Sequence, residues 1–146
     1  MGYSHYYRGW AKIDESFIND AYRVIEAAGV SLGDAHGKNE PVLISGEVIL
    51  LNGDASKGES LETFQLKHGV NHRSFVKTQY NPYDIVVCVL LLRAASLNKG
   101  FKVRSDGAWD QLGWDNARRL YARVFGVSPV KPDEMFANQA EADADY

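Results

Sequence analysis

The segment from Pro82 to about Leu97 constrains the fold more than any other part of the chain, because its residues are apolar on nearly every side. A helix with one apolar stripe can lie on a surface, but a helix that is apolar all round has to be covered on all sides. We therefore predict that this segment is the most buried helix. Its longest apolar run, Ile85 to Leu92, is far shorter than the roughly 20 residues needed to cross a bilayer.

The single cysteine, Cys88, lies inside this apolar run. One cysteine cannot form an internal disulfide, and a free cysteine in an apolar segment usually packs as a small hydrophobe. We interpret Cys88 as a buried, unreactive thiol. The first residues lack the charged and apolar zones of a signal peptide. We therefore expect the protein in a reducing cytoplasm, without a membrane partner.

The remaining pattern predicts an α+β domain. Strands are expected over residues 2–11, 42–54, 61–68 and 101–105, helices over 14–29, 82–97 and 115–125, and connections over 31–41 and 69–80. The strand over 61–68 is expected to pair back on the strand over 42–54 as a hairpin. The order of the first six elements matches a ferredoxin-like β-α-β-β-α-β sheet with its helices packed on one face, plus an extra C-terminal helix.

The net charge of −3 is unevenly distributed. Residues 127–146 carry five acidic side chains against Lys131 alone, while residues 1–126 are nearly neutral. We predict one globular domain over 1–126, followed by an acidic, mobile tail. The body has no basic run suited to double-stranded nucleic acid. The sequence does not indicate an oligomeric state.

The stretch "VKTQYNPYD" precedes the apolar helix. Asn81 is a good N-cap, Pro82 suits the first helical position, and Asp84 can reach back to the cap, so "NPYD" is explained as a helix start. Lys77 and Thr78 are not explained in this way. A helix N-terminus favours anions, so these two side chains predict a site for a phosphate or carboxylate. The alternative is a solvated lysine on a loop.

A ferredoxin-like order would bring three polar and aromatic clusters to one end of the sheet. These are Tyr3, His5 and Tyr7; Lys77 and Thr78; and Arg104, Ser105, Asp106 and Trp109. Aromatic faces and cations together suit a ligand with a ring and a phosphate. The alternative is that the aromatic side chains pack in the core and "SDG" forms a turn.

Two further combinations of residues were considered. His5 could form an acid–base pair with Asp84 or Asp106. His68 and His72 are four residues apart, but a helix is not expected there and further ligands cannot be identified. We therefore predict no metal site and no cofactor.

The segments "MGYSHYYRGW", "VKTQYNPYD" and "VRSDGAWD" resemble a set of small uncharacterised proteins from bacteriophages and actinobacteria, which typically open with Met-Gly-Tyr-Thr-His-Tyr. The resemblance covers most of residues 1–126. It departs at Ser4, Tyr7, Val76 and Arg104, where the set has Thr, Trp, Cys and Ser, so a cysteine chemistry at position 76 is excluded. The resemblance implies a phage or bacterial source, with the host cytoplasm as the compartment of a phage-encoded chain. It suggests no reaction, but it suggests that the three clusters belong together.

These observations lead to three hypotheses about function. The first is a small phage-type accessory protein that binds an anionic, nucleotide-like small molecule and could sequester a host defence signal. The second is a nucleotide hydrolase or transferase at the same site, with His5 as base and Lys77 or Arg104 stabilising charge. The third is a protein-interaction module that inhibits a host enzyme.

Overall fold

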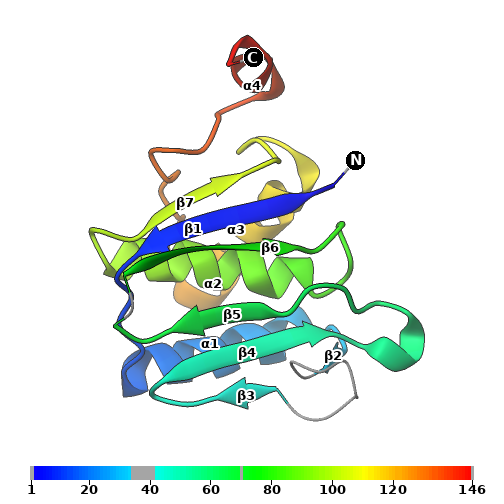
Figure 1. Cartoon of the computed structure of the whole chain (residues 1–146), viewed down its shortest axis with the longest axis vertical. Coiled ribbons are helices and arrows are strands. Elements are labelled where there is room, and N and C mark those ends of the chain that lie inside the picture. The colour runs from blue at the N-terminus through cyan, green and yellow to red at the C-terminus, as the bar shows by residue number, and fades with distance from the viewer. Residues whose placement is uncertain (1, 34–41, 70, 146) are drawn as a thin grey trace.

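The computed structural model describes residues 2–33, 42–69 and 71–145 (Figure 1), so most of the connection expected over 31–41 lies outside the described residues. The helices of the described part are α1 (Glu15–Ala28), α2 (Asp84–Leu97), α3 (Leu112–Phe125) and α4 (Gln139–Ala144), with a single 3-10 turn, η1 (Ala55–Lys57). The strands of the described part are β1 (Ser4–Gly9), β2 (Leu32–Gly33), β3 (Leu43–Ile44), β4 (Val48–Gly53), β5 (Phe64–Lys67), β6 (His72–Lys77) and β7 (Lys102–Ser105).

The described strands form two antiparallel sheets. The first has the order β6-β1-β7, and the second has the order β2-β4-β3, with β5 also paired to β4. In Figure 1, β5 lies beside β6, and α1, α2 and α3 all lie behind the strands. The opposite side of the first sheet is therefore left uncovered by helices.

The core lies between the helices and the strands, and α2 is at its centre. Every residue of α2 from Val86 to Leu92 is buried, which confirms the prediction of a helix covered on all sides. Arg93 connects α2 to its neighbours: its Nε donates to the Asp20 carboxylate of α1 at 2.8 Å, and its NH1 donates to the Tyr121 hydroxyl of α3 at 3.1 Å. The three long helices thus form one packed layer.

The predicted α+β class is confirmed, and so are several local predictions. Asp14 caps α1 by accepting from the Phe17 N–H at 2.9 Å, and Gly29 ends this helix with a φ of 64°. The hairpin of β4 and β5 is also present. Two predictions are wrong: the strand expected over 42–54 is two strands joined by a turn at residues 45–47, and the connection expected over 69–80 contains β6.

The ferredoxin-like arrangement of the sheet is not confirmed, because the strands fall into two antiparallel sheets rather than one. On one side β1 pairs with β6. The sequence pattern instead predicts residues 61–68 as the third strand of the ferredoxin-like order. The first sheet does retain the expected order in which β1 lies between the two strands joined by α2.

The C-terminal segment contacts the turn that follows β7. The Trp109 N–H donates to the Phe136 carbonyl at 2.7 Å, the Asp110 N–H donates to the Ala137 carbonyl at 3.2 Å, and Met135 is buried. Short α4 follows these contacts (Figure 1). The mobility of the acidic tail stays a prediction, and these hydrogen bonds are the interactions that such motion would have to break.

Candidate functional site

The alternation of side chains along β1 divides the predicted site between two faces of the first sheet. Neighbouring residues in a strand point to opposite faces, and residues paired directly across strands share a face. His5 is paired with Ser105, and both are buried on the side that faces the helices, which we call the inner face. Tyr6 is paired with Phe75 and Arg104 on the uncovered side, which we call the outer face.

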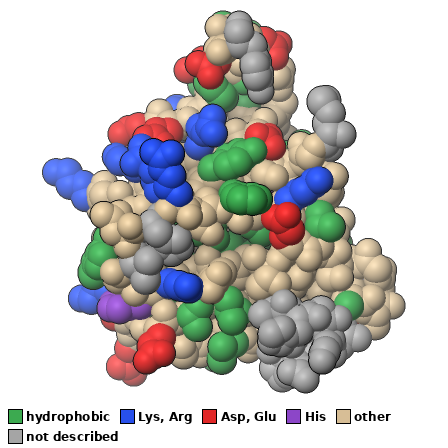
Figure 2. Space-filling model, viewed as in Figure 1, with side chains coloured by type: hydrophobic (Ala, Val, Ile, Leu, Met, Phe, Trp, Pro, Cys, Tyr) green, Lys and Arg blue, Asp and Glu red, His purple; other side chains and the backbone are tan. Residues whose placement is uncertain are grey.

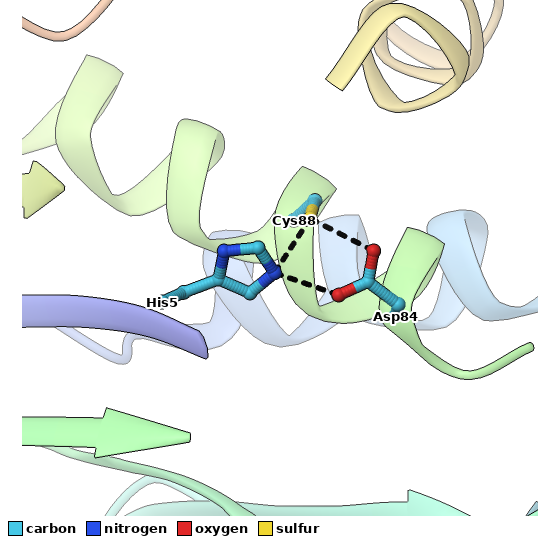
Figure 3. Close-up of side chains that lie close together, drawn as sticks. All are labelled: His5, Asp84 and Cys88. Carbon is cyan, nitrogen blue, oxygen red and sulfur yellow. Dashed lines mark hydrogen bonds and ion pairs between the residues drawn. The ribbon is translucent and has the colours of Figure 1, made fainter. Parts of the chain in front are cut away.

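The inner face holds a buried group of polar side chains that we call the inner cluster: His5, Thr78, Asp84, Cys88 and Ser105. Figure 3 shows three of them, with the His5 ring from β1 pointing at Asp84 and Cys88 from the first turns of α2. Three of the five, His5, Thr78 and Ser105, were predicted as site residues. Their burial requires that their polar atoms be hydrogen-bonded inside the protein.

The Ser105 hydroxyl determines where the proton of His5 lies. Its oxygen accepts from the Trp114 indole N–H at 2.9 Å and from the Gly107 backbone N–H at 3.0 Å, which uses both lone pairs. The hydroxyl proton is therefore donated to His5 Nδ1, which is 2.8 Å away. It follows that His5 is neutral with its proton on Nε2, and that Nε2–H donates to Asp84 Oδ1 at 2.6 Å.

Asp84 is the acceptor on which the inner cluster converges. Its Oδ1 accepts from the Thr78 hydroxyl at 2.5 Å as well as from His5. The interpretation of "NPYD" as a capping sequence is therefore wrong: α2 begins at Asp84 with Tyr83 in the cap position, and the Asn81 amide donates to the Glu59 carbonyl at 3.1 Å. The Asp84 carboxylate still benefits from the positive end of α2, but it serves the buried network.

Cys88 completes the inner cluster as a thiol. Its Sγ lies 3.3 Å from His5 Nε2 and 3.5 Å from Asp84 Oδ2. Burial raises the pKa of Cys88 well above its ordinary value, and the nearby negative charge of Asp84 raises it further. A thiol that keeps its proton is a poor nucleophile, so the structure agrees with an unreactive role.

His5, Asp84 and Cys88 also offer three ligand atoms within 4.8 Å of one another, and a metal ion was therefore considered. A histidine that binds a metal needs a free lone pair on the ligating nitrogen, and it usually donates its other N–H to an oxygen. Here the nitrogen that faces Asp84 and Cys88 carries the proton, and the other nitrogen accepts one. The 2.6 Å between Nε2 and Oδ1 is a hydrogen-bond distance. The three side chains are thus hydrogen-bonded to one another, and a metal ion at this place would have to displace the Nε2 proton, so the absence of a metal site stays a prediction.

A strained turn covers the inner cluster. Gln79 and Tyr80 have φ angles of 52° and 61°, in the left-handed region that side-chain-bearing residues rarely adopt. The turn is held because the Tyr3 N–H donates to the Gln79 side-chain oxygen at 2.9 Å, while the N–H groups of Thr78 and Gln79 donate to the Tyr3 carbonyl. The Tyr80 ring then stacks on Tyr3 with centroids 3.6 Å apart.

Tyr3 itself is buried between this turn and the cluster, 4.9 Å from the His5 ring centroid. Its hydroxyl has no hydrogen-bond partner within the described part of the chain. Burial raises the pKa of Tyr3, so the hydroxyl remains protonated. The cluster is closed to a substrate as it stands, and we interpret it as a polar clamp that joins β1, β7, α2 and the turn.

The outer face, in contrast, is open. A cavity of about 570 Å³ lies on it, lined by Tyr6, Tyr7, Arg8, Arg73, Ser74, Phe75, Lys102, Arg104 and Glu134. In Figure 2, which shows this side of the molecule, basic side chains gather next to hydrophobic ones over the first sheet. This volume is within the range of small-molecule sites.

Four cations line the outer-face cavity, and strand pairing fixes their arrangement. Arg8 of β1 lies opposite Arg73 of β6 and opposite Lys102 of β7, so the three form one row across the sheet, which we call the basic row. Arg104 lies two residues further along β7 than Lys102, with its guanidinium carbon 4.8 Å from the Tyr6 ring centroid. Arg8 forms an ion pair with Glu134, whereas Arg73 and Lys102 form no ion pair with an acidic residue in the described part of the chain.

The structure therefore separates the nine predicted site residues. Tyr3, His5, Tyr7, Thr78 and Ser105 are buried on the inner side, with the Tyr7 hydroxyl donating to the Gln65 carbonyl at 2.5 Å. Arg104, Asp106 and Lys77 lie on the outer side, and of these three only Arg104 lines the cavity, to which Tyr7 also contributes. Trp109 packs under Arg118, whose guanidinium carbon is 4.9 Å from its ring centroid. The expected convergence of His5, Lys77 and Arg104 in one pocket is wrong, because His5 points to the opposite face.

Sequence reasoning missed most of the outer-face residues, namely Tyr6, Arg8, Arg73, Phe75 and Lys102. The signal was a period of two in "YYRG", "HRSF" and "KVRS", where basic or aromatic residues alternate with others. This signal identifies a common face only when all three segments are recognised as neighbouring strands.

Comparison of the chain with known protein families, with curated proteins and with solved structures finds no match. The helices in the described ranges are all too short or too polar to cross a membrane. The functional argument therefore depends on the geometry of the two faces.

Proposed function

We propose that this protein binds an anionic, nucleotide-like small molecule on the outer face of its first sheet. The observation that supports this proposal is the basic row of Arg73, Arg8 and Lys102 beside the aromatic pair of Phe75 and Tyr6. The class of ligand is the one expected from the sequence, whereas the site is moved from the sheet end to the outer face.

The basic row has a cost in the absence of a ligand. Like charges placed directly opposite each other on neighbouring strands destabilise a sheet. Arg8 has two cations as its cross-strand neighbours, and within the described residues only Glu134 is its acidic partner. A phosphate bound between them would remove this repulsion, and charge-assisted hydrogen bonds from guanidinium groups to phosphate are among the stronger polar interactions in proteins.

Binding without turnover is favoured over the enzyme alternative. The groups with acid–base or nucleophilic capacity that were considered, His5, Asp84 and Cys88, belong to the closed inner cluster. The outer-face cavity supplies positive charge and flat rings, which bind and orient a ligand but do not by themselves transfer a proton. Sequestration of a signalling nucleotide, suggested by the resemblance to phage proteins, is one use of such a site.

Calorimetric titration of the full chain with inorganic triphosphate, with adenosine and with ATP tests the proposal. We expect ATP to bind more tightly than either part alone, and to bind less tightly as salt is added, because surface charges are screened. Arg73→Ala and Lys102→Ala should each weaken ATP binding by about 1.5–3 kcal/mol, the usual range for hydrogen bonds to charged groups. Lys57→Ala, in η1 and outside the cavity, is the matched control.

Cyclic nucleotides and ADP-ribose complete the set of compounds, and product analysis after incubation separates binding from turnover. Equal loss of affinity in Lys57→Ala would assign the attraction to net charge rather than to the basic row. If none of the phosphate compounds binds at low salt, the proposal is wrong.

A further inference from the structure

The outer face presents two separate aromatic platforms. The Tyr6 and Phe75 rings come from neighbouring strands at directly paired positions, with centroids 6.4 Å apart and planes inclined by 34°. Phe75 is 61% exposed although it is a large apolar side chain in a regular strand. The two rings do not stack on each other, so each has a face of its own to offer.

The platform at Tyr6 is built from more than the ring. The Tyr6 hydroxyl donates to Asp106 at 3.1 Å, which fixes the orientation of the ring, and the Arg104 guanidinium lies over it. Bases stack on arginine planes as well as on aromatic rings. The pair of Tyr6 and Arg104 is therefore a prepared surface for one base, and Phe75 is a second surface on the next strand.

The basic row is longer than a single phosphate requires. It crosses three neighbouring strands, and a strand spacing of about 4.8 Å gives it a length of about 10 Å. It runs parallel to the row that holds Phe75, Tyr6 and Arg104, two residues away along each strand. Two parallel rows, one of rings and one of cations, match a chain that has bases on one side and phosphates on the other.

We propose that the outer face binds a single-stranded oligonucleotide, with two adjacent nucleotides as its smallest footprint. This inference rests on the proposed function, because it uses the same site and extends the ligand from one nucleotide to two or more. One base stacks on Phe75 and the next on Tyr6 and Arg104, while the basic row contacts the phosphates. Antiparallel sheets that bind single-stranded RNA use aromatic side chains on neighbouring strands in this way.

A duplex does not fit this arrangement, because the faces of its bases are covered by their neighbours within the helix. The contacts are to base faces and phosphates, so the preference for particular bases should be weak. The chain has a net charge of −3, so its attraction for nucleic acid is confined to this face rather than spread over the surface.

The experiment measures displacement of a fluorescent, single-stranded oligouridylate of about eight nucleotides from the full chain. The competitors are uridine monophosphate, the dinucleotide uridylyl-uridine, and a duplex of the same length. We expect the dinucleotide to compete about 5- to 150-fold better than the monophosphate, the range that corresponds to one additional stacked base. Phe75→Leu, which keeps an apolar side chain but removes the flat ring, should abolish this advantage, and Phe75→Tyr should retain it.

The outcomes distinguish the inference from the proposed function. If the dinucleotide and the monophosphate compete equally, the inference is wrong and the proposed function stands. If no compound competes and the oligonucleotide does not bind, both are wrong. Retention of the full advantage in Phe75→Leu, or equal competition by the duplex, would show that the attraction is electrostatic only and would also overturn the inference.

Discussion

The two faces of the first sheet use the same strands for opposite purposes. On the inner face, four hydrogen bonds join Ser105, His5, Asp84 and Thr78 into a buried chain with Trp114 at one end. On the outer face, three positions further along β1, Arg8 faces two other cations across the strands. Every described polar group on His5 is paired internally, whereas much of the charge on the outer face is left for solvent or a ligand.

This difference shows where stability and binding reside. A buried polar group that loses its partner costs free energy, so the inner cluster fixes the fold. Exposed charges that repel each other do not stabilise the fold. Their presence in a row therefore indicates that they interact with a ligand rather than with the chain itself. Because β1 supplies both faces, variants one residue apart should affect different properties.

The largest effect is expected for Asp84→Ala. This change removes the acceptor of the buried His5 N–H and of the Thr78 hydroxyl. We expect the free energy of unfolding to fall by about 2–4 kcal/mol, because each unsatisfied buried donor costs about 1–3 kcal/mol. The desolvation cost of the buried carboxylate is removed at the same time, which offsets part of this loss. Denaturant titration measures the change.

Asp106→Ala is the matched control on the outer side. Asp106 is exposed, and it accepts from the Ser4 N–H at 2.9 Å and from the Tyr6 hydroxyl. Its removal should cost about 1 kcal/mol or less, since water can take the place of the exposed carboxylate. If the two aspartates cost the same, the division between a stabilising inner face and a binding outer face is wrong.

The second effect is a dependence of stability on alkaline pH. The pKa of the Cys88 thiol is raised above its ordinary value of 9.0 by burial and then by the charge of Asp84. Above pH 9 the unfolded chain therefore releases a proton that the folded chain retains, and stability falls as pH rises, by about 1.4 kcal/mol per pH unit for one group. Tyr3 and Tyr7, whose pKa values burial raises above 10.0, add to the fall from pH 10 upward.

Urea unfolding at a series of pH values measures this slope. Cys88→Ala should remove the part between pH 9 and 10, whatever its effect on absolute stability. Ser96→Ala, a small substitution at an exposed position near the end of α2, should leave that part unchanged. A stability that is constant from pH 8 to 10 in the natural chain would mean that the thiol ionises as freely in the folded state as in the unfolded state.

Local signals allowed the three long helices to be predicted from the sequence, but not α4. The oxygen of Asp14 and the positive φ of Gly29 determine the ends of α1, and both residues are recognisable without knowledge of the fold. The burial of α2 follows from its composition, because no arrangement of that segment leaves an apolar side to water. These features depend on residues that are close together in the chain.

The candidate site could not be predicted in the same way, because it depends on pairing between distant strands. The segment "HRSFVK" has no strong strand signal, and its pairing with β1 makes it a strand. The sequence pattern predicts a connection over residues 69–80, and without β6 there is no register that separates His5 from Lys77 and Arg104. Neighbouring residues in a strand point to opposite faces of the sheet, so residues of both faces were grouped into one predicted site.

The smallest effect is expected for Glu134→Gln, and it concerns the boundary of the outer face. The Glu134 carboxylate, from the acidic C-terminal segment, forms the ion pair with Arg8 at the edge of the cavity. It is therefore an internal anion that competes with a bound phosphate for Arg8. Neutralising it should raise the affinity for ATP by about 1.4- to 5-fold, since exposed ion pairs contribute about 0.2–1 kcal/mol. Glu47→Gln, at the exposed turn between β3 and β4, changes the net charge equally and should leave the affinity nearly unchanged.

An equal gain in both variants would mean that net charge, rather than competition for Arg8, governs the affinity. If Glu134→Gln lowers the affinity, the carboxylate positions Arg8 for the ligand, and the C-terminal segment is part of the site.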